Sequence, residues 1–356
     1  MAARFWRQSG RSVVSGFHHR VLSPSQGTRH LSVVRVLKDA SVSVQEGGNP
    51  LPPPEPGQVN VKLHVAPCTP ADIRRFKSNP SSSECPHVGG DEGLFEVTET
   101  GEGVNTLRPG DLAVPTISKR TPGSGDYEGT WRSTASFPEA SLVRVPADEI
   151  CDLSAAAHVS GTIATAVRLL ADFSPTKELG RGDRVVFTGS RSAVAQVLLQ
   201  LAAERGIQSV CLVSSQEEAA LARKLGASKA TELKEFKAMR LNDAYLVVDG
   251  EGGVLGFTAA RALRFRGFYV SYADASGDGV SLPVAGQIFS DTRSRGFSLQ
   301  RWRTEHSEEE ARDLVTESLN LARGLKLQGT REFPISKASA AVEAAGIPGG
   351  PVLFRG

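Results

Sequence analysis

The amino-acid sequence predicts an α/β fold in which a mostly β part, in the form of a small barrel, precedes a doubly wound parallel sheet. From Ser32 to about Ile150 the chain consists of short apolar runs broken by turn residues. After about Leu153, apolar runs alternate with helical segments at spacings of roughly 25–35 residues, which is the order that builds a parallel sheet. The 36 glycines also suit an α/β protein with many tight turns better than a helical bundle.

The first strands of the β part are predicted by the alternation of apolar and polar residues. Val34–Leu37 and Val59–Val65 alternate with a period of two, as half-buried strands do. Pro52–Gly57 lies between them and carries four prolines, which excludes a helix or an interior strand there. Further turns are predicted at Gly89-Gly90, Pro109-Gly110-Asp111 and Gly123-Ser124-Gly125.

The elements of the parallel sheet follow an alanine-rich helical segment from Ser154 to Leu170. The first apolar run, Arg184–Phe187, leads through a Gly/Ser turn into a helix at Val194–Glu204. Further strands are predicted at Ser209–Val213, Tyr245–Val248 and Gly267–Tyr272, with helices at Glu217–Leu225 and Gly256–Leu263. The last predicted elements are an amphipathic helix at Glu308–Ala322 and a strand at Gly350–Phe354 that is able to return to the β part.

Composition excludes several classes of protein. Hydrophobic residues make up 40% of the chain and charged residues 22%, which is ordinary for a globular protein and unlike a disordered, collagen-like or disulfide-scaffold chain. No run reaches the ~18 uninterrupted apolar residues of a membrane span. The four cysteines, Cys68, Cys85, Cys151 and Cys211, stand far apart without a paired spacing, so we expect neither a metal site nor a disulfide framework.

The N-terminal segment has a charge pattern of its own. Arg4, Arg7, Arg11, Arg20, Arg29 and Arg35 all precede the first acidic residue, Asp39. An acid-free start rich in Arg and Ser is typical of a mitochondrial transit peptide, although a basic tail is the alternative. We therefore expect residues 1–30 to be removed and the protein to act in the mitochondrial matrix. Without the five arginines of residues 1–30, 36 basic residues face 39 acidic ones, so no basic field would recruit nucleic acid.

A candidate phosphate-binding loop lies between the first strand of the parallel sheet and the helix after it. Backbone N–H groups and the helix N-terminus face a ligand at such a position. The candidate binding residues are Gly189, Ser190, Arg191, Ser192, Ala193, Val194 and Ala195. Ala193 and Ala195 stand where the later glycines of such loops are found, and each adds a methyl group that hinders close approach.

The end of the second strand of the parallel sheet should specify the ribose of a dinucleotide. Sites for NAD place an acid there, and sites for NADP place an arginine nearby. This chain offers Ser214, Ser215 and Gln216, which are neither acidic nor basic. Arg191 is the nearby cation, and we expect it to be a solvated loop arginine.

Several motifs, taken in order, resemble the zinc-free, quinone oxidoreductase-like branch of the medium-chain dehydrogenases/reductases. Within that branch, the sequence is similar to the mitochondrial trans-2-enoyl-thioester reductases of type II fatty acid synthesis. The motifs are Val88–Gly93, Leu107–Val114, Gly129–Trp131, Ser192–Gln196 and Arg295–Trp302, the last followed by His306-Ser307.

The resemblance implies a fold, a cofactor and a substrate. The fold is a GroES-like β-barrel domain with an inserted Rossmann-type doubly wound parallel sheet. We expect the barrel domain at residues 31–154 and 305–356 and the Rossmann domain at residues 155–304. The cofactor would be NADPH, and the substrate an enoyl thioester of coenzyme A or acyl carrier protein. Dimers are usual in the family, so the partner is a second copy or a larger mitochondrial complex.

The sequence departs from the family pattern at the chemistry-bearing positions. Pro70–Ile73 and Asn79 match the segment before the family's catalytic tyrosine, but Pro80 occupies the tyrosine position. Proline has no side-chain hydrogen-bonding group, so the catalytic residue is unassigned. Tyr272 or Ser160 would have to replace it.

Cofactor positions depart in the same way. Thr162 stands at a family asparagine, Ser214 and Gln216 at two arginines for the 2′-phosphate, and Gly350 at a lysine. Tyr272 and Phe297 complete the candidate cofactor residues. His158, Cys68 and Glu308–Glu310 are expected to be structural. The sequence therefore predicts weak or absent NADPH binding, with two alternatives: a reductase with weak or lost activity, or a non-catalytic subunit or ligand-binding protein.

Overall fold

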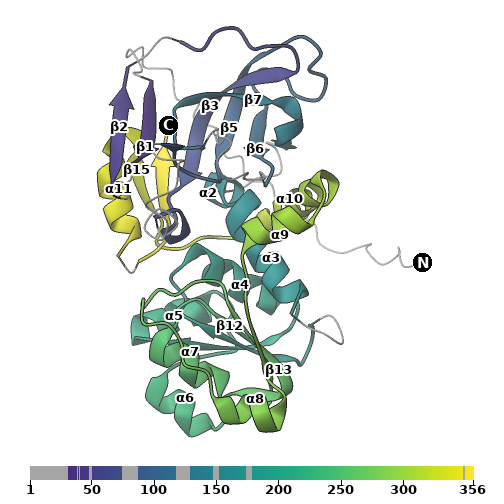
Figure 1. Ribbon diagram of the computed structural model, residues 1–356, viewed down its shortest axis with the longest axis vertical. Helices are drawn as coiled ribbons and strands as arrows, with labels where there is room; N and C mark the ends of the chain where they lie inside the picture. The colour runs from purple at the N-terminus through teal and green to yellow at the C-terminus, as the bar shows by residue number, and fades with distance from the viewer. Residues whose placement is uncertain are drawn as a thin grey trace, which may run out of the picture. The chain divides into compact units, whose positions relative to one another are not determined.

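The computed structural model describes residues 31–37, 39, 41–47, 50–73, 87–117, 129–146, 152–173, 179–347 and 349–356 (Figure 1). Pro80, Cys85, Cys151, the predicted turn at Gly123–Gly125 and the predicted transit peptide lie outside the described residues.

The β part begins with a small antiparallel sheet. Strand β1 (Ser32–Val36) pairs with β2 (Val42–Glu46) on one side and with β4 (His87–Val88) on the other. Burial alternates along β1, with Val34 and Val36 fully buried, which confirms the period of two seen in the sequence.

A larger sheet completes the β part. Its path runs β15-β16-β3-β5-β6-β8, and β7 also pairs with β3. The strands are β3 (Gln58–Pro67), β5 (Leu94–Thr100), β6 (Leu112–Pro115), β7 (Thr134–Pro138), β8 (Leu142–Val145), β15 (Arg331–Pro334) and β16 (Val352–Arg355). Leu353 of β16 is in register with Pro67 of β3, so the C-terminal strand returns to the β part as predicted.

Six of the described strands form the predicted parallel sheet. They are β9 (Arg184–Thr188), β10 (Gln208–Val213), β11 (Lys229–Glu232), β12 (Ala244–Asp249), β13 (Leu263–Ser271) and β14 (Arg293–Gly296). Their order is β11-β10-β9-β12-β13-β14, and every neighbouring pair is parallel. The order reverses between β9 and β12, so ligands of such sheets bind beyond the carboxyl ends of these two strands.

Helices cover both faces of the parallel sheet, because alternate residues of its strands are buried on opposite sides. Val185 and Phe187 of β9 belong to the apolar cluster that includes α4 (Ala193–Glu204) and α5 (Gln216–Lys224). Val186 belongs to the cluster that includes α6 (Leu233–Met239) and α7 (Gly253–Ala260). Burial on both faces explains why these strands are continuous apolar runs in the sequence.

The remaining helices lie between the β part and the parallel sheet or within one of them. The predicted alanine-rich helix is α2 (Leu153–Ala157), a π-helical segment (Val159–Ile163) and α3 (Ala164–Ala171). The others are α8 (Val284–Ser290), α9 (Leu299–Glu305), α10 (Glu308–Ala322) and α11 (Ala338–Ala345), with single 3₁₀ turns at Glu139–Ser141 and Ile335–Lys337. Glu308 and Glu309 lie in the first turn of α10, and Glu310 completes a capping box with Ser307, which supports their structural interpretation.

Within the described part of the chain, none of the helices is long and apolar enough to span a membrane. The predicted domain boundaries at 154/155 and 304/305 stay predictions.

Candidate functional site

The loop after β9 has the conformation that its residues predict. Gly189 has a φ of +70°, in the left-handed region that favours glycine. Ser192 caps α4, because its Oγ accepts a hydrogen bond from the backbone N of Ala195 at 3.1 Å. Gln196 donates from Nε2 to the carbonyl of Arg191 at 3.1 Å. The loop is therefore held closely against the first turn of α4.

A buried acid organises the neighbouring turn after β12. Asp249 is fully buried, and its carboxylate accepts hydrogen bonds from the hydroxyls of Thr188 and Tyr269. It also accepts from the backbone N of Gly252 at 3.1 Å. Thr188 ends β9 and Tyr269 lies on β13, so this carboxylate ties three neighbouring strands together at the point where the strand order reverses.

Glu251, two residues after Asp249, lies against the candidate phosphate-binding loop. A β-carbon built on Gly189 would lie only 2.1 Å from Oε1 of Glu251. The carboxylate thus fills the space that glycine leaves open at the start of the loop. An anionic pyrophosphate would meet a carboxylate there. As the structure stands, these residues do not fit the pyrophosphate of a dinucleotide.

Tyr272 completes this cluster. Its hydroxyl lies 3.3 Å from Oγ of Ser192, and a β-carbon on Gly250 would lie 2.4 Å from the same hydroxyl. Burial raises the pKa of Tyr272 well above its usual value of 10, and the nearby acids Glu251 and Asp249 add to this. The hydroxyl stays protonated at neutral pH and can donate a hydrogen bond beside the loop.

The surroundings of the end of β10 correct one expectation from the sequence. Arg191 is not a solvated loop arginine: its side chain is 29% exposed, and its Nη1 pairs with Oε1 of Glu218 at 3.1 Å. Its Nη2 also lies 3.5 Å from Glu217 and 3.4 Å from Oγ of Ser215. Ser214, Ser215 and Gln216 are themselves neither acidic nor basic, and the arginine beside them is paired with two acids.

Glu218 is the functional candidate that sequence reasoning missed. Its Oε2 accepts hydrogen bonds from the backbone N and the Oγ of Ser214, at 2.9 Å and 3.1 Å. The side chain of Glu218 reaches back to Ser214, because Ser215 caps α5 and places Glu218 in the first turn of that helix. The Ser-x-x-Glu spacing of Ser215 and Glu218 was the signal that could have found it.

The structure brings most of the predicted cofactor residues together around the loop, whereas three of them make their contacts with other elements. Gln216 donates its side-chain amide to Glu232, away from the loop. Phe297 donates its backbone N–H to Ser271 at 2.8 Å, and its ring packs edge-on against Phe173 with a centroid separation of 6.0 Å.

Thr162 is the third of these residues, and it binds a buried acid of the β part, Glu92. Its backbone N and its hydroxyl both donate to Glu92 at 2.8 Å, and Gly161 donates to the same carboxylate at 2.9 Å. Burial raises the pKa of Glu92 to about 7, although these hydrogen bonds oppose the rise. The hydroxyl of Thr162 is therefore committed to a structural contact.

The remaining polar candidates have different surroundings. Nδ1 of His158 donates to the carbonyl of Ser154 at 2.7 Å, and burial lowers the pKa of His158 to about 4, so the ring is neutral. The hydroxyl of Ser160 is buried and has no hydrogen-bond partner among the residues described. Cys68 is buried, which raises the pKa of its thiol. The described residues contain no cluster of three His, Cys, Asp or Glu side chains able to hold a metal.

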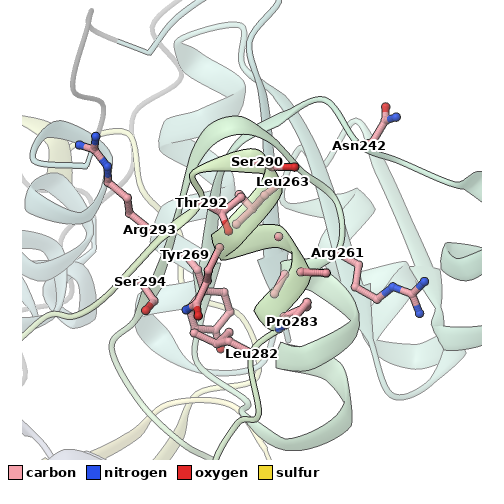
Figure 2. Close-up of a pocket in the computed structure, with 14 residues that line it drawn as sticks. Asn242, Arg261, Leu263, Tyr269, Leu282, Pro283, Ser290, Thr292, Arg293 and Ser294 are labelled. Carbon is pink, nitrogen blue, oxygen red and sulfur yellow. The ribbon is translucent and has the colours of Figure 1, made fainter.

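Two hollows lie away from the phosphate loop. One of about 290 Å³ lies beneath α8 and is lined by Tyr269, Arg261 and Thr292 among others (Figure 2). It contains none of the predicted site residues. A smaller one of about 180 Å³ is lined by Phe297 and by Trp302, whose ring stacks on His306 at 4.0 Å.

Comparisons with known proteins agree with this architecture. A family model for the alcohol dehydrogenase GroES-like domain matches residues 55–147. The human mitochondrial enoyl-[acyl-carrier-protein] reductase is 29% identical over 96% of this chain and 93% of its own length. The enzyme of the same name from Xenopus tropicalis is 30% identical over 81% of this chain and 80% of its own length. The structure of Etr1p with NADP and crotonyl-CoA superposes with a TM-score of 0.75 at 20% identity, covering 92% of this chain and all of that one. The chain therefore combines a GroES-like domain with a Rossmann-type parallel sheet.

Proposed function

Because this chain belongs to the family of mitochondrial enoyl-[acyl-carrier-protein] reductases, we propose that its ligand is an enoyl thioester of coenzyme A or acyl carrier protein. Its compartment is the mitochondrial matrix. NADPH binds weakly or not at all, so reduction of the thioester is slow or lost. The family relationship supports the substrate class, and the charges around the phosphate loop support the weak cofactor binding.

The observation that carries the proposal is the pairing of Arg191. Recognition of NADPH needs a cation for the 2′-phosphate at the end of the second strand. Arg191 of the loop after β9 reaches toward that position, where its Nη2 lies 3.4 Å from Oγ of Ser215, and Glu218 and Glu217 already pair with it. Each charged hydrogen bond forgone to a 2′-phosphate forfeits ~1.5–3 kcal/mol. The excess of negative charge there removes the usual preference for NADPH over NADH.

Pro80 supports the same conclusion for the chemical step. Loss of one positioned acid or hydrogen-bond donor costs ~10²–10⁴-fold in rate. Tyr272 is a neutral donor, but its hydroxyl lies beside Ser192. It is therefore placed to contact a ligand of the loop.

A second candidate function is a non-catalytic one: a subunit of a larger mitochondrial assembly, as a second copy or with another protein, or a ligand-binding protein. The contact between Glu251 and Gly189 favours it, because a chain that no longer binds a dinucleotide is free to keep an acid there.

Calorimetric titration with NADPH and NADH, followed by turnover with a medium-chain enoyl-CoA, tests the proposal. We expect weak isotherms with little difference between the two cofactors. Tight, NADPH-selective binding or an ordinary turnover of ~1–10³ per second would contradict it.

Variants that restore the family's side chains distinguish the loss of the catalytic tyrosine from the loss of cofactor binding. We expect Pro80→Tyr alone to gain little activity, because the cofactor site remains altered. A variant that combines Pro80→Tyr with changes at the cofactor site should gain more activity. The added changes are Ala193→Gly, Ala195→Gly, Ser214→Arg and Gln216→Arg. A full gain from Pro80→Tyr alone would show that the cofactor site is intact.

A further inference from the structure

We infer that Glu251 is an internal anion that occupies the phosphate loop and competes with the pyrophosphate of a dinucleotide. The inference rests on the proposed weak cofactor binding and names a second residue, beside the paired Arg191, that contributes to it.

The backbone of Glu251 is fixed by the turn after β12. Its N–H donates to Oγ1 of Thr188 at 3.2 Å and to Oδ1 of Asp249 at 3.1 Å. Gly250 donates to the same Thr188 hydroxyl at 3.0 Å. Because Thr188 directly precedes Gly189, the hydrogen bonds that hold this turn also hold it beside the loop.

The side chain then lies where a ligand phosphate would approach. Oε1 of Glu251 is 2.1 Å from the position of a β-carbon on Gly189, so the carboxylate covers the open side of that glycine. Loops of this kind bind anions through backbone N–H groups and the helix dipole. A carboxylate is an anion that can take the same stabilisation, and two anions cannot share it at close range without repulsion.

The charge of Glu251, rather than its volume alone, opposes the ligand. Glu251→Gln keeps the shape of the side chain and removes the charge, whereas Glu251→Ala removes both. Glu204→Gln is the matched control, because Glu204 is exposed at the far end of α4 and loses the same charge.

The test is the dissociation constant of each variant for NADPH, NADH and ADP-ribose, measured by calorimetry, with the melting temperature as a check of folding. All three ligands carry the pyrophosphate. We expect Glu251→Gln and Glu251→Ala to bind each of them about tenfold or more tightly than the unmodified protein, which corresponds to ~1.4 kcal/mol. Glu204→Gln should change the affinities less than about twofold, as expected for a distant exposed charge.

The outcomes separate this inference from the proposed function. Weak binding by the unmodified protein with no gain in either Glu251 variant overturns the inference and leaves the proposed function standing. Tight binding by the unmodified protein overturns the proposed function, and a further gain in the variants would still support the inference. A gain confined to NADPH also overturns the inference, because it would place the effect at the 2′-phosphate. A gain in Glu251→Ala alone overturns the role of charge.

Discussion

Glu92 is a buried acid whose ionisation should make the stability of this protein depend on pH. Only 5% of the residue is exposed, and Gly161 and Thr162 donate hydrogen bonds to it from the π-helical segment. Burial raises the pKa of Glu92 from 4.5 to about 7 in the folded protein. In the unfolded chain the carboxyl returns to its ordinary pKa.

The sign of the effect follows from the two pKa values. Below 4.5 the acid is protonated in both states, so folding carries no ionisation penalty. Between 4.5 and about 7 the unfolded chain loses the proton while the folded protein keeps it, so stability falls as pH rises. Across this interval the free energy of unfolding falls by roughly 3 kcal/mol, because a difference of one pKa unit corresponds to about 1.4 kcal/mol.

Urea unfolding of the unmodified protein and of Glu92→Gln, repeated at several pH values between about 5 and about 8, measures how the free energy of unfolding depends on pH. Glutamine resembles the protonated acid and cannot ionise, so the variant should lose roughly 2–3 kcal/mol less across that range. Glu102→Gln is the control, because Glu102 is exposed. Parallel pH curves for the unmodified protein and Glu92→Gln would refute the argument.

Three other predictions concern stability and processing. Gly90→Ala should destabilise the protein by more than ~3 kcal/mol, because a β-carbon on this residue, whose φ is +86°, would lie 2.2 Å from the ring of Trp131. The control is Gly103→Ala, because Gly103 has a φ of +81° but open space around it. This variant should lose only the ~1–2 kcal/mol that the left-handed backbone conformation costs. Chemical denaturation compares the two, and equal losses would contradict the clash. Ser307→Ala should cost ~1 kcal/mol through the lost cap of α10, whereas an unchanged unfolding midpoint would show that the cap contributes nothing. Finally, N-terminal sequencing of the protein from its own mitochondria should begin near residue 31, and a start at Met1 or Ala2 would refute the transit peptide.

The short, polar elements of the parallel sheet were the ones that the sequence did not reveal. Strand β14 has the sequence Arg-Ser-Arg-Gly and is exposed throughout, and α8 buries none of its residues. Neither has the apolar periodicity on which prediction depends. Strand β11, which contributes two buried residues, was also missed, because its four residues carry too short a pattern.

The sequence by itself determined the fold class and the place of the candidate phosphate-binding loop between β9 and α4. Strands buried on both faces must be apolar runs, and a Gly/Ser turn between such a run and a helix is a local feature, so both are visible in the order of residues. Only the tertiary structure decided what surrounds the loop. Glu251 meets Gly189 because β12 lies beside β9, and Glu92 meets Thr162 across 70 positions of the chain. Such contacts depend on strand order and on how the elements pack, which the periodicity of neighbouring residues does not encode.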